Sequence, residues 1–453
     1  MRVWFAFFAG LAVSLTLCAQ PAGAGPARPS EQPKNAQGAT APGSVVRADS
    51  LADPAQRQLA LDTFEKVWTT IRDTHWEKNP AGLDWQAIHD EFRPRVAKAA
   101  NMDAARSAIR DMLGRLHQTH FAIFPATVYD AVREDAAGPG SPGIDLRILD
   151  GQAVVTGVDP GSSAERAGVR PGWAIQSIKG RDLGPAVRAL RADPAISDIA
   201  ATRALLASLT GPVGEKIEAV FLDGSNRRVS LDLELAEPRG APAEFGNLPV
   251  QHVWFEAKKI GQASYIRFNL FLDVTRVMDG FSKAITDCGA CDGLVIDLRG
   301  NPGGLGAMAM GMAGFLVDKV GQRLGTMYMR GATLNFVINP RRPSFAGPVA
   351  VLMDAESAST SEIFAGGLKD LGRARVFGTR SAAAALPSLI ERLPNGDGFQ
   401  HAIANYISEG GQSLEGLGVA PDMEVKLTRE ALLAGRDPVL DAALQWIKKK
   451  GTQ

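Results

Sequence analysis

The chain has 453 residues, of which 45% are apolar and 22% charged, and its 49 Lys and Arg balance its 49 Asp and Glu. This composition is typical of a globular protein of roughly three domains, and the balanced charge argues against a nucleic-acid coat protein or a polybasic membrane binder. Three cysteines and six scattered histidines exclude a disulfide scaffold and a Cys-rich zinc module, and we predict neither a metal nor an organic cofactor.

The N-terminus has the pattern of a secretory signal peptide. Arg2 precedes the apolar run from Val3 to Leu17, which is shorter than the roughly 20 residues needed to span a bilayer. The small residues Ala22-Gly23-Ala24 predict cleavage after residue 24 and an exported, periplasmic protein. The alternatives are an uncleaved anchor and lipidation at Cys18, which a preceding Leu disfavours.

Residues 25–54 are rich in Pro, Ala, Gly, Ser and Gln and predict a flexible leader. Apolar residues then recur at helical spacing, which predicts an N-terminal helical domain over residues 55–137. The three apolar stripes are Phe64, Val67, Trp68 and Ile71; Trp85, Ile88, Phe92 and Val96; and Ile109, Met112, Leu113 and Leu116.

Residues 138–237 read as a small module of strands and turns with one helix. Strands are predicted over 144–149 and 153–158, joined by Asp150-Gly151, and over 216–222 and 227–235, joined by Asp223-Gly224. A further strand is predicted over 173–178 and a helix over 199–209.

Residues 238–453 alternate between strands and helices. Strands are predicted over 263–268, 294–298 and 349–353, with helices around 281–286, from about 359, and over 437–450. This order predicts βα units and a mostly parallel, buried sheet. The whole chain is therefore predicted to be an α/β, multidomain α+β protein. No later segment is long and apolar enough to be a membrane span.

The segment after the strand at 349–353 is a candidate nucleophile site. A short loop of small residues leads to a helix, so Ser359 would lie at a helix N-terminus, where free N–H groups favour negative charge. The alternative is that Ser357, Ser359 and Ser361 are simply helix caps and small packing residues.

A Gly-rich turn follows the strand at 294–298. Gly300-Asn301-Pro302-Gly303-Gly304 could offer bare N–H groups to an oxyanion or a phosphate, although no phosphate-loop or dinucleotide pattern is present. A tight turn between a strand and a helix would also explain the three glycines.

These two segments, in this order, resemble the C-terminal processing peptidase and tricorn-core family of serine peptidases over about residues 55–430. The resemblance implies a crotonase-like catalytic domain over 238–453 and a PDZ-like module over 138–237, since residues 159–173 are similar to a run common in bacterial PDZ domains. It further implies that the module binds the C-terminal tails of polypeptide substrates with its carboxylate-binding loop and strand, which are Gly143, Ile144, Asp145 and Leu146.

The resemblance makes Ser359 the nucleophile and places the family's Asp at Asp370. The family's usual general base, a Lys, falls on Ala384, so a Ser–Lys dyad of that kind cannot operate. Lys369 lies ten positions past Ser359 on the same predicted helix, roughly 15 Å along its axis.

The tricorn-like branch of the family uses a His instead, and here that His aligns with His120. Thr119 replaces the family's Ser, and Glu415 aligns with its supporting Glu. The chemistry is coherent because a neutral imidazole can accept a proton from a Ser hydroxyl. The alternatives are that His120 is a buried core residue and that His117 is the base.

The oxyanion hole would pair the Thr360 N–H with an N–H from Gly303 or Gly304. We therefore predict a serine endopeptidase. The rival hypotheses are a catalytically silent binding protein on the same scaffold and a hydrolase of other acyl bonds. Separately, Cys288 and Cys291 could close a small disulfide or remain free thiols.

Overall fold

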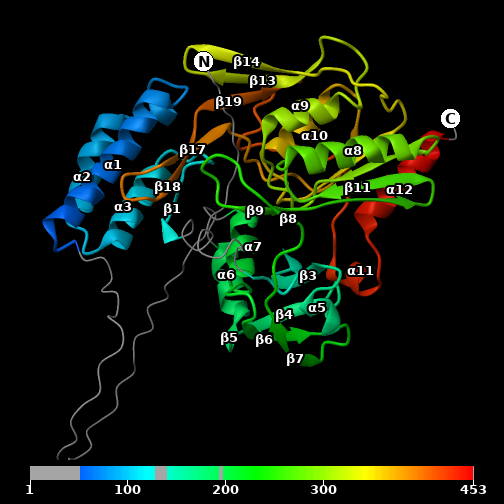
Figure 1. Ribbon diagram of the computed structural model, residues 1–453, viewed down its shortest axis with the longest axis horizontal. Helices are drawn as coiled ribbons and strands as arrows, with labels where there is room; N and C mark the ends of the chain where they lie inside the picture. Colours follow the sequence, from blue (N-terminus) through cyan, green and yellow to red (C-terminus); the bar gives the residue numbers. More distant parts are fainter. Residues whose placement is uncertain (1–50, 128–139, 193–196, 452–453) are drawn as a thin grey trace, which may run out of the picture.

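The computed structural model describes residues 51–127, 140–192 and 197–451 (Figure 1). The predicted signal peptide, and the predicted leader apart from its last four residues, lie outside these ranges. Within them, no helix combines the length and the apolar character needed to cross a bilayer.

The N-terminal part is a block of three helices, as predicted. They are α1 (Pro54–Thr74), α2 (Trp85–Ala97) and α3 (Met102–Gly114), with a short 3-10 turn, η1, at Pro80–Gly82. Each long helix begins after a residue whose side chain accepts a backbone N–H, namely Asp53, Asp84 and Asn101. The predicted apolar stripes pack together in one buried cluster.

The helical block joins the C-terminal part of the chain through a small sheet. Strand β1 (Ala122–Phe124) pairs with β18 (Gly398–Ala402), which pairs with β17 (Ser388–Arg392), both antiparallel. Beside this sheet, Arg106 of α3 donates two hydrogen bonds of 2.8 and 3.0 Å to the fully buried Asp397. This junction fixes where the chain after α3 lies.

The second part is a six-stranded antiparallel sheet, with five strands in the order β2-β3-β4-β6-β7 and a sixth, β5, paired with β4. The strands are β2 (Ile144–Leu149), β3 (Gln152–Val158), β4 (Ala174–Ile178), β6 (Lys216–Leu222) and β7 (Arg228–Glu234), with the short β5 (Arg181–Asp182) beside β4. Both predicted hairpins are confirmed.

Three helices accompany this second sheet: α5 (Ser163–Arg166), α6 (Leu183–Ala192) and α7 (Asp198–Ala207). Helix α6 was not predicted. It packs against β3 and β4, whereas α7 packs against the edge strand β2.

The third part is a six-stranded sheet in the order β10-β11-β12-β15-β16-β20, parallel except for the antiparallel β10, which confirms the predicted parallel sheet. The strands are β10 (Phe255–Ile260), β11 (Ala263–Phe268), β12 (Gly293–Asp297), β15 (Val349–Met353), β16 (Arg375–Gly378) and β20 (Met423–Glu424).

Both faces of this sheet are covered. Val295, Ala350 and Leu352 pack against α12 (Pro438–Gly451), and the alternate residues pack in the main core with α8 (Val274–Cys288), α9 (Gly306–Ala313) and α10 (Thr360–Asp370). Two-sided burial explains why these strands are apolar without interruption. A disulfide joins Cys288 and Cys291.

Smaller elements complete the fold. Strands β14 (Ala332–Val337), β13 (Arg323–Met329) and β19 (Ala404–Ser408) form a sheet, and β8 (Ala241–Ala243) pairs with β9 (Gln251–Val253). Helix α11 (Arg429–Leu433) reaches the second part, where Arg429 donates hydrogen bonds to the carbonyls of Gly172 and Asp223 and to the side chain of Asn226.

Candidate active site

Ser359 lies where strand β15 has ended and helix α10 is about to begin. Its backbone has φ 55° and ψ −118°, a conformation that residues with a side chain rarely adopt, and only 1% of the residue is exposed. Such strain is found mainly at functional sites, where the surrounding contacts hold it in place. The Ser359 hydroxyl makes no hydrogen bond to any described residue.

The Gly-rich turn lies directly against this serine. A Cβ atom on Gly303, which has φ 100°, would come within 2.7 Å of the Thr360 nitrogen and 2.8 Å of the Ser359 Cβ. Only glycine fits this close approach. The turn is therefore more than a tight connection between a strand and a helix, because it also forms one wall of the site.

The candidate oxyanion donors differ in their availability. The Gly303 N–H donates to the Asn301 side chain at 2.9 Å, so it is already used. Within the described ranges, the N–H groups of Thr360 and Gly304 have no such acceptor, while the Thr360 hydroxyl donates to the Gly304 carbonyl at 2.7 Å. The geometry therefore favours Thr360 and Gly304 over Gly303.

Three of the predicted residues form a connected network around His120. The Thr119 hydroxyl donates to Glu415 Oε2 at 2.9 Å and lies 2.7 Å from His120 Nδ1. The Thr119 N–H also donates to Glu415 Oε1, and the Ala385 N–H donates to Glu415 Oε2. Three residues separated by up to 296 positions are thus brought together.

This network sets the tautomer of His120. The Thr119 hydroxyl has one proton, which Glu415 accepts, so its oxygen is left to accept the Nδ1–H of the imidazole. The other ring nitrogen, Nε2, then carries the lone pair. It is buried and has no hydrogen-bond partner among the described residues, which is the state that a general base requires.

Burial has the largest effect on the pKa values of His120 and Glu415. It lowers the pKa of His120 to about 4, so the imidazole is neutral at physiological pH. Burial also raises the pKa of Glu415, which the hydrogen bonds from Thr119 and Ala385 oppose.

The loop at 383–385 connects the serine to the His120 network. The Ala384 carbonyl accepts the Ser359 N–H at 2.8 Å, and the next N–H, from Ala385, binds Glu415. Ser359 is therefore bound to this loop directly, and His120 is linked to it only through Thr119 and Glu415. Their free atoms, the hydroxyl and Nε2, do not hydrogen bond to each other.

The sequence analysis missed Glu362, which is fully buried in the same loop system. Its carboxyl group accepts N–H groups of Ser359, Ala383 and Ala384 at 2.9–3.0 Å and the Ser381 hydroxyl at 2.6 Å. Burial raises its pKa to about 7. The pattern Ser359-x-x-Glu362, typical of a helix capping box, could have identified it.

The rival candidates lie elsewhere. His117 is exposed, unlike His120. Lys369, at the far end of α10, donates to the Ala420 carbonyl and pairs with Asp422. Asp370 accepts the Gly410 N–H. At Ala384, the position of the absent Lys, the side chain packs instead against Ala358 and Ile199 of α7.

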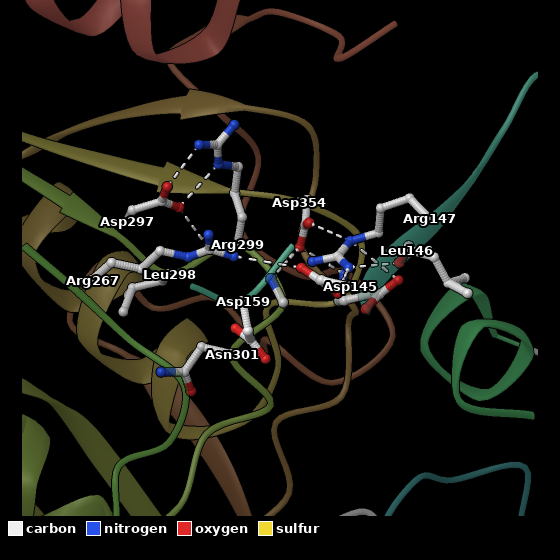
Figure 2. A network of polar contacts seen from close by, with 12 residues as sticks. Asp145, Leu146, Arg147, Asp159, Arg267, Asp297, Leu298, Arg299, Asn301 and Asp354 are labelled. Carbon is white, nitrogen blue, oxygen red and sulfur yellow. Dashed lines mark hydrogen bonds and ion pairs between the residues drawn. The ribbon is translucent and has the colours of Figure 1, made fainter. Parts of the chain in front are cut away.

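Arg147 of strand β2, also missed, reaches the loop before Ser359 (Figure 2). Its guanidinium donates to Asp354 at 2.9 Å, to Asp145 at 2.7 Å and to the Leu146 carbonyl at 2.7 Å. Asp354 also accepts the Gly300 N–H at 2.9 Å. Arg147 therefore contacts the residue that ties the Gly-rich turn to the nucleophile loop.

The predicted peptide-binding residues begin at the edge strand β2. Gly143 has φ 78°, and its N–H donates to the Ser141 hydroxyl at 3.0 Å. Ile144 and Leu146 are buried in the module core, and Asp145 pairs with Arg147 and, at 3.5 Å, with Arg267.

Comparison with known proteins agrees with this arrangement. Residues 262–425 match peptidase family S41, and residues 60–114 match the tricorn protease C1 domain. The chain thus contains a peptidase family S41 domain and is a serine peptidase. The matched regions contain Ser359 and most of the helical block.

Curated relatives cover most of this S41 peptidase. It is 25% identical over 395 residues to the carboxyl-terminal-processing protease of Picosynechococcus, covering 82% of this chain and 85% of that one. It is 24% identical over 401 residues to a tricorn protease homolog of Streptomyces coelicolor, covering 84% of this chain. The chain spans only 32% of the length of that tricorn homolog.

Solved structures share the fold. A photosystem II D1 C-terminal processing protease superposes with a TM-score of 0.55 at 22% identity, covering 86% of this chain and 97% of that one. Mature CPAF superposes with a TM-score of 0.57 at 14% identity, covering 88% and 97%. The α/β architecture is thus that of this peptidase fold.

Proposed function

We propose that this S41 peptidase is exported, captures the C-terminal tails of polypeptides on the PDZ-like module at 138–237, and cleaves them with Ser359 as nucleophile and His120 as base. The observation that supports the proposal is a pair of buried atoms without hydrogen bonds, Ser359 Oγ and His120 Nε2. Ser359 binds Ala384, and His120 is linked to Ala385 through Thr119 and Glu415.

The reaction follows from the roles of these groups. His120 Nε2 takes the proton of the Ser359 hydroxyl as the oxygen attacks the peptide carbonyl, and the N–H groups of Thr360 and Gly304 receive the oxyanion. The protonated imidazole then gives its proton to the leaving amine, which leaves an acyl-enzyme. Water, deprotonated by the same nitrogen, hydrolyses the ester and restores the serine.

Thr119 and Glu415 act on the imidazole. The Thr119 oxygen holds the Nδ1–H and so keeps the lone pair on Nε2, and the Glu415 carboxylate balances the imidazolium formed in the reaction. The Ser359 hydroxyl and His120 Nε2 do not hydrogen bond to each other, so proton transfer requires the two loops to move closer as substrate binds.

The edge strand supports tail capture. Strand β2 has a strand neighbour, β3, on one side only. Val155 of β3 donates its N–H to the Trp173 carbonyl, so the Leu146–Val155 pair is not hydrogen-bonded and the Leu146 backbone groups face the open edge. A substrate tail added there would displace Arg147 from the Leu146 carbonyl.

Export rests on the N-terminal pattern, and the Cys288–Cys291 disulfide is compatible with an oxidising compartment. We propose the same division of the chain as above: residues 55–137 supply the base, 138–237 capture the tail, and 238–453 carry the nucleophile.

A fluorophosphonate probe tests the proposal directly. Labelling of wild-type protein at Ser359, loss of labelling in Ser359→Ala, and strongly reduced labelling in His120→Ala are expected. Hydrolysis of an unfolded protein substrate should fall at least about a thousand-fold in each variant. His117→Ala, which alters an exposed histidine three residues away, is the matched control and should retain activity.

Absence of labelling in folded wild-type protein would instead favour a catalytically silent binding protein. Full activity of His120→Ala would remove His120 from the mechanism, and hydrolysis of esters but not peptides would show a different acyl substrate.

A further inference from the structure

A cavity lies between the PDZ-like module and the catalytic sheet, and Ser359 is not among the residues that line it. It has a volume of about 280 Å³ and is lined by the end of β2, the start of α7 and the carboxyl ends of β15, β16 and β20. The carboxyl edge of a parallel sheet is where ligands usually bind in such folds. The mechanism proposed above makes no use of this cavity.

The lining of the cavity combines aliphatic and charged side chains, and one buried carboxyl group stands out. Ile148, Leu149, Met353 and Val425 provide aliphatic surface. Glu356 is 6% exposed, and its Oε1 atom makes no hydrogen bond within the described chain, although it lies 3.2 Å from Arg147 Nε. This buried oxygen is therefore paired with a charge but accepts no hydrogen bond, so a ligand group that donates one to it would be stabilised.

The lining of the cavity has four acidic residues, Asp150, Asp198, Asp354 and Glu356, and three basic ones, Arg147, Arg299 and Lys426, so acids exceed bases by one when Glu356 is ionised. The buried Arg203, outside this lining, also interacts electrostatically with Glu356. Two of the bases are also bonded to acids outside the lining: Figure 2 shows Arg147 with Asp145 and Arg299 with Asp297. Arg299 also pairs with Asp437. Burial raises the pKa of Glu356 to about 8, so an arriving cation would favour its ionised form.

The direction of a captured tail leads into this cavity. We consider a tail that adds antiparallel to β2 and places its carboxylate at Gly143. Its last residue then lies beside Ile144, and the residues that precede it in the tail lie successively closer to Leu149. At about 3.3 Å per residue, its fifth and sixth residues from the end lie beside Ile148 and Leu149, at the mouth of the cavity.

We propose that this cavity is a specificity pocket for a basic side chain, Lys or Arg, at the fifth or sixth residue from the end of the captured polypeptide tail. The aliphatic stem would lie against Ile148, Leu149 and Val425, and the cationic head would donate to Glu356. This inference rests on the proposed capture of C-termini by β2 and adds a substrate class to it.

The test uses the full-length Ser359→Ala protein and fluorescent ten-residue peptides in an anisotropy titration. The peptides share their last four residues and carry Lys, Gln or Glu at both the fifth and sixth positions. The Lys peptide should bind about tenfold more tightly than the Glu peptide. In the same background, Glu356→Gln should bring that ratio close to one, whereas Glu234→Gln, on the opposite edge strand β7, should leave it unchanged.

Two further measurements separate the possible failures. Leu427→Trp fills the cavity without altering Glu356 and should also abolish the Lys preference. A peptide with an amidated C-terminus tests capture itself: if it binds as well as the free acid, both capture and the pocket are wrong. If binding needs the carboxylate but shows no Lys preference, or a preference that neither variant alters, the pocket alone is wrong.

Discussion

The hydroxyl of Thr119 connects two groups that differ greatly in sequence position. It donates to Glu415 and accepts from His120, so one atom both orients the imidazole and satisfies a half-buried carboxylate. The methyl group of the threonine has no part in this, which explains how Thr can replace the Ser expected from the family.

Replacing Thr119 therefore tests the role of the hydroxyl separately from that of the ring. We expect Thr119→Val to lower kcat by about 10²-fold or more, since His120 loses the acceptor that fixes its tautomer. Thr119→Ser should retain most of the activity. Equal losses in both variants, measured with one peptide substrate, would show that the hydroxyl is not what matters.

The pH dependence of activity should reflect two buried groups. Because burial lowers the pKa of His120 to about 4, the imidazole remains a base well below pH 6. Glu362 has a pKa raised to about 7, and Glu415, the other carboxyl near the ring, also has a raised pKa. We expect kcat/KM to fall in two steps as the pH decreases, near 7 and again near 4.

The variant Glu362→Gln distinguishes these steps. It removes the group that titrates near pH 7, so only the lower step should persist in its profile of kcat/KM against pH. A single step near 6.5 in both proteins would mean that the base has an ordinary, solvated imidazole pKa.

At the scale of elements, the junction between α3 and the β17–β18 hairpin positions the base. Asp397 is fully buried and also accepts the Ala126 N–H and an Asn395 N–H at 2.8 Å. Removing Arg106 would leave this carboxyl without its cation. The segment that holds His120 lies between α3 and β1, so its position depends on this contact.

We expect Arg106→Met to destabilise the protein by about 3–5 kcal/mol, as for other buried pairs that lose one partner. Arg110→Met, on the exposed side of the same helix, is the matched control and should have an effect below about 0.5 kcal/mol. Denaturant unfolding measures both. Similar values for the two variants would show that the Arg106–Asp397 pair contributes little.

The elements that were predicted have strong local patterns. The helical stripes and the apolar strands at 294–298 and 349–353 are buried, and burial imposes the periodicity that made them visible. The β17–β18 hairpin was missed although Asn395-Gly396 is a turn signal, because its strands carry polar residues such as Gln400, which is buried where the distant strand β1 pairs with β18.

The residues of the candidate site also differ in how far the sequence could predict them. Ser359, Thr119, His120 and Glu415 came from resemblance to a family, not from local pattern. Arg147 could not be predicted, since its contacts with Asp354 and Glu356 cross more than 200 residues and nothing in the sequence near Arg147 indicates them.

At the scale of the whole molecule, several contacts hold the β-rich module at residues 138–237, among them the Arg267–Asp145 ion pair. Arg147 and α7 contact the catalytic loops, and Arg429 of α11 binds the turn regions on the other side. The segment from β20 to α12 therefore acts as a clamp on the module as well as a connection.

Loss of Arg429 should loosen this clamp. We expect Arg429→Ala to increase the rate of limited proteolysis within residues 425–437 several-fold, because three hydrogen bonds to the module are lost. Arg436→Ala, which replaces an exposed arginine in the same segment, should be cleaved at the same rate as the wild type. An unchanged rate in Arg429→Ala would mean that other contacts hold the module.

The pairing of β1 with β18 joins the first hundred residues of the described chain to its last quarter. In the proposed mechanism, a polypeptide still being synthesised possesses the imidazole long before the serine, and the hairpin that secures the imidazole emerges later still. An incompletely synthesised chain would therefore be inactive, and proteolytic activity would arise only after β1 had paired with β18.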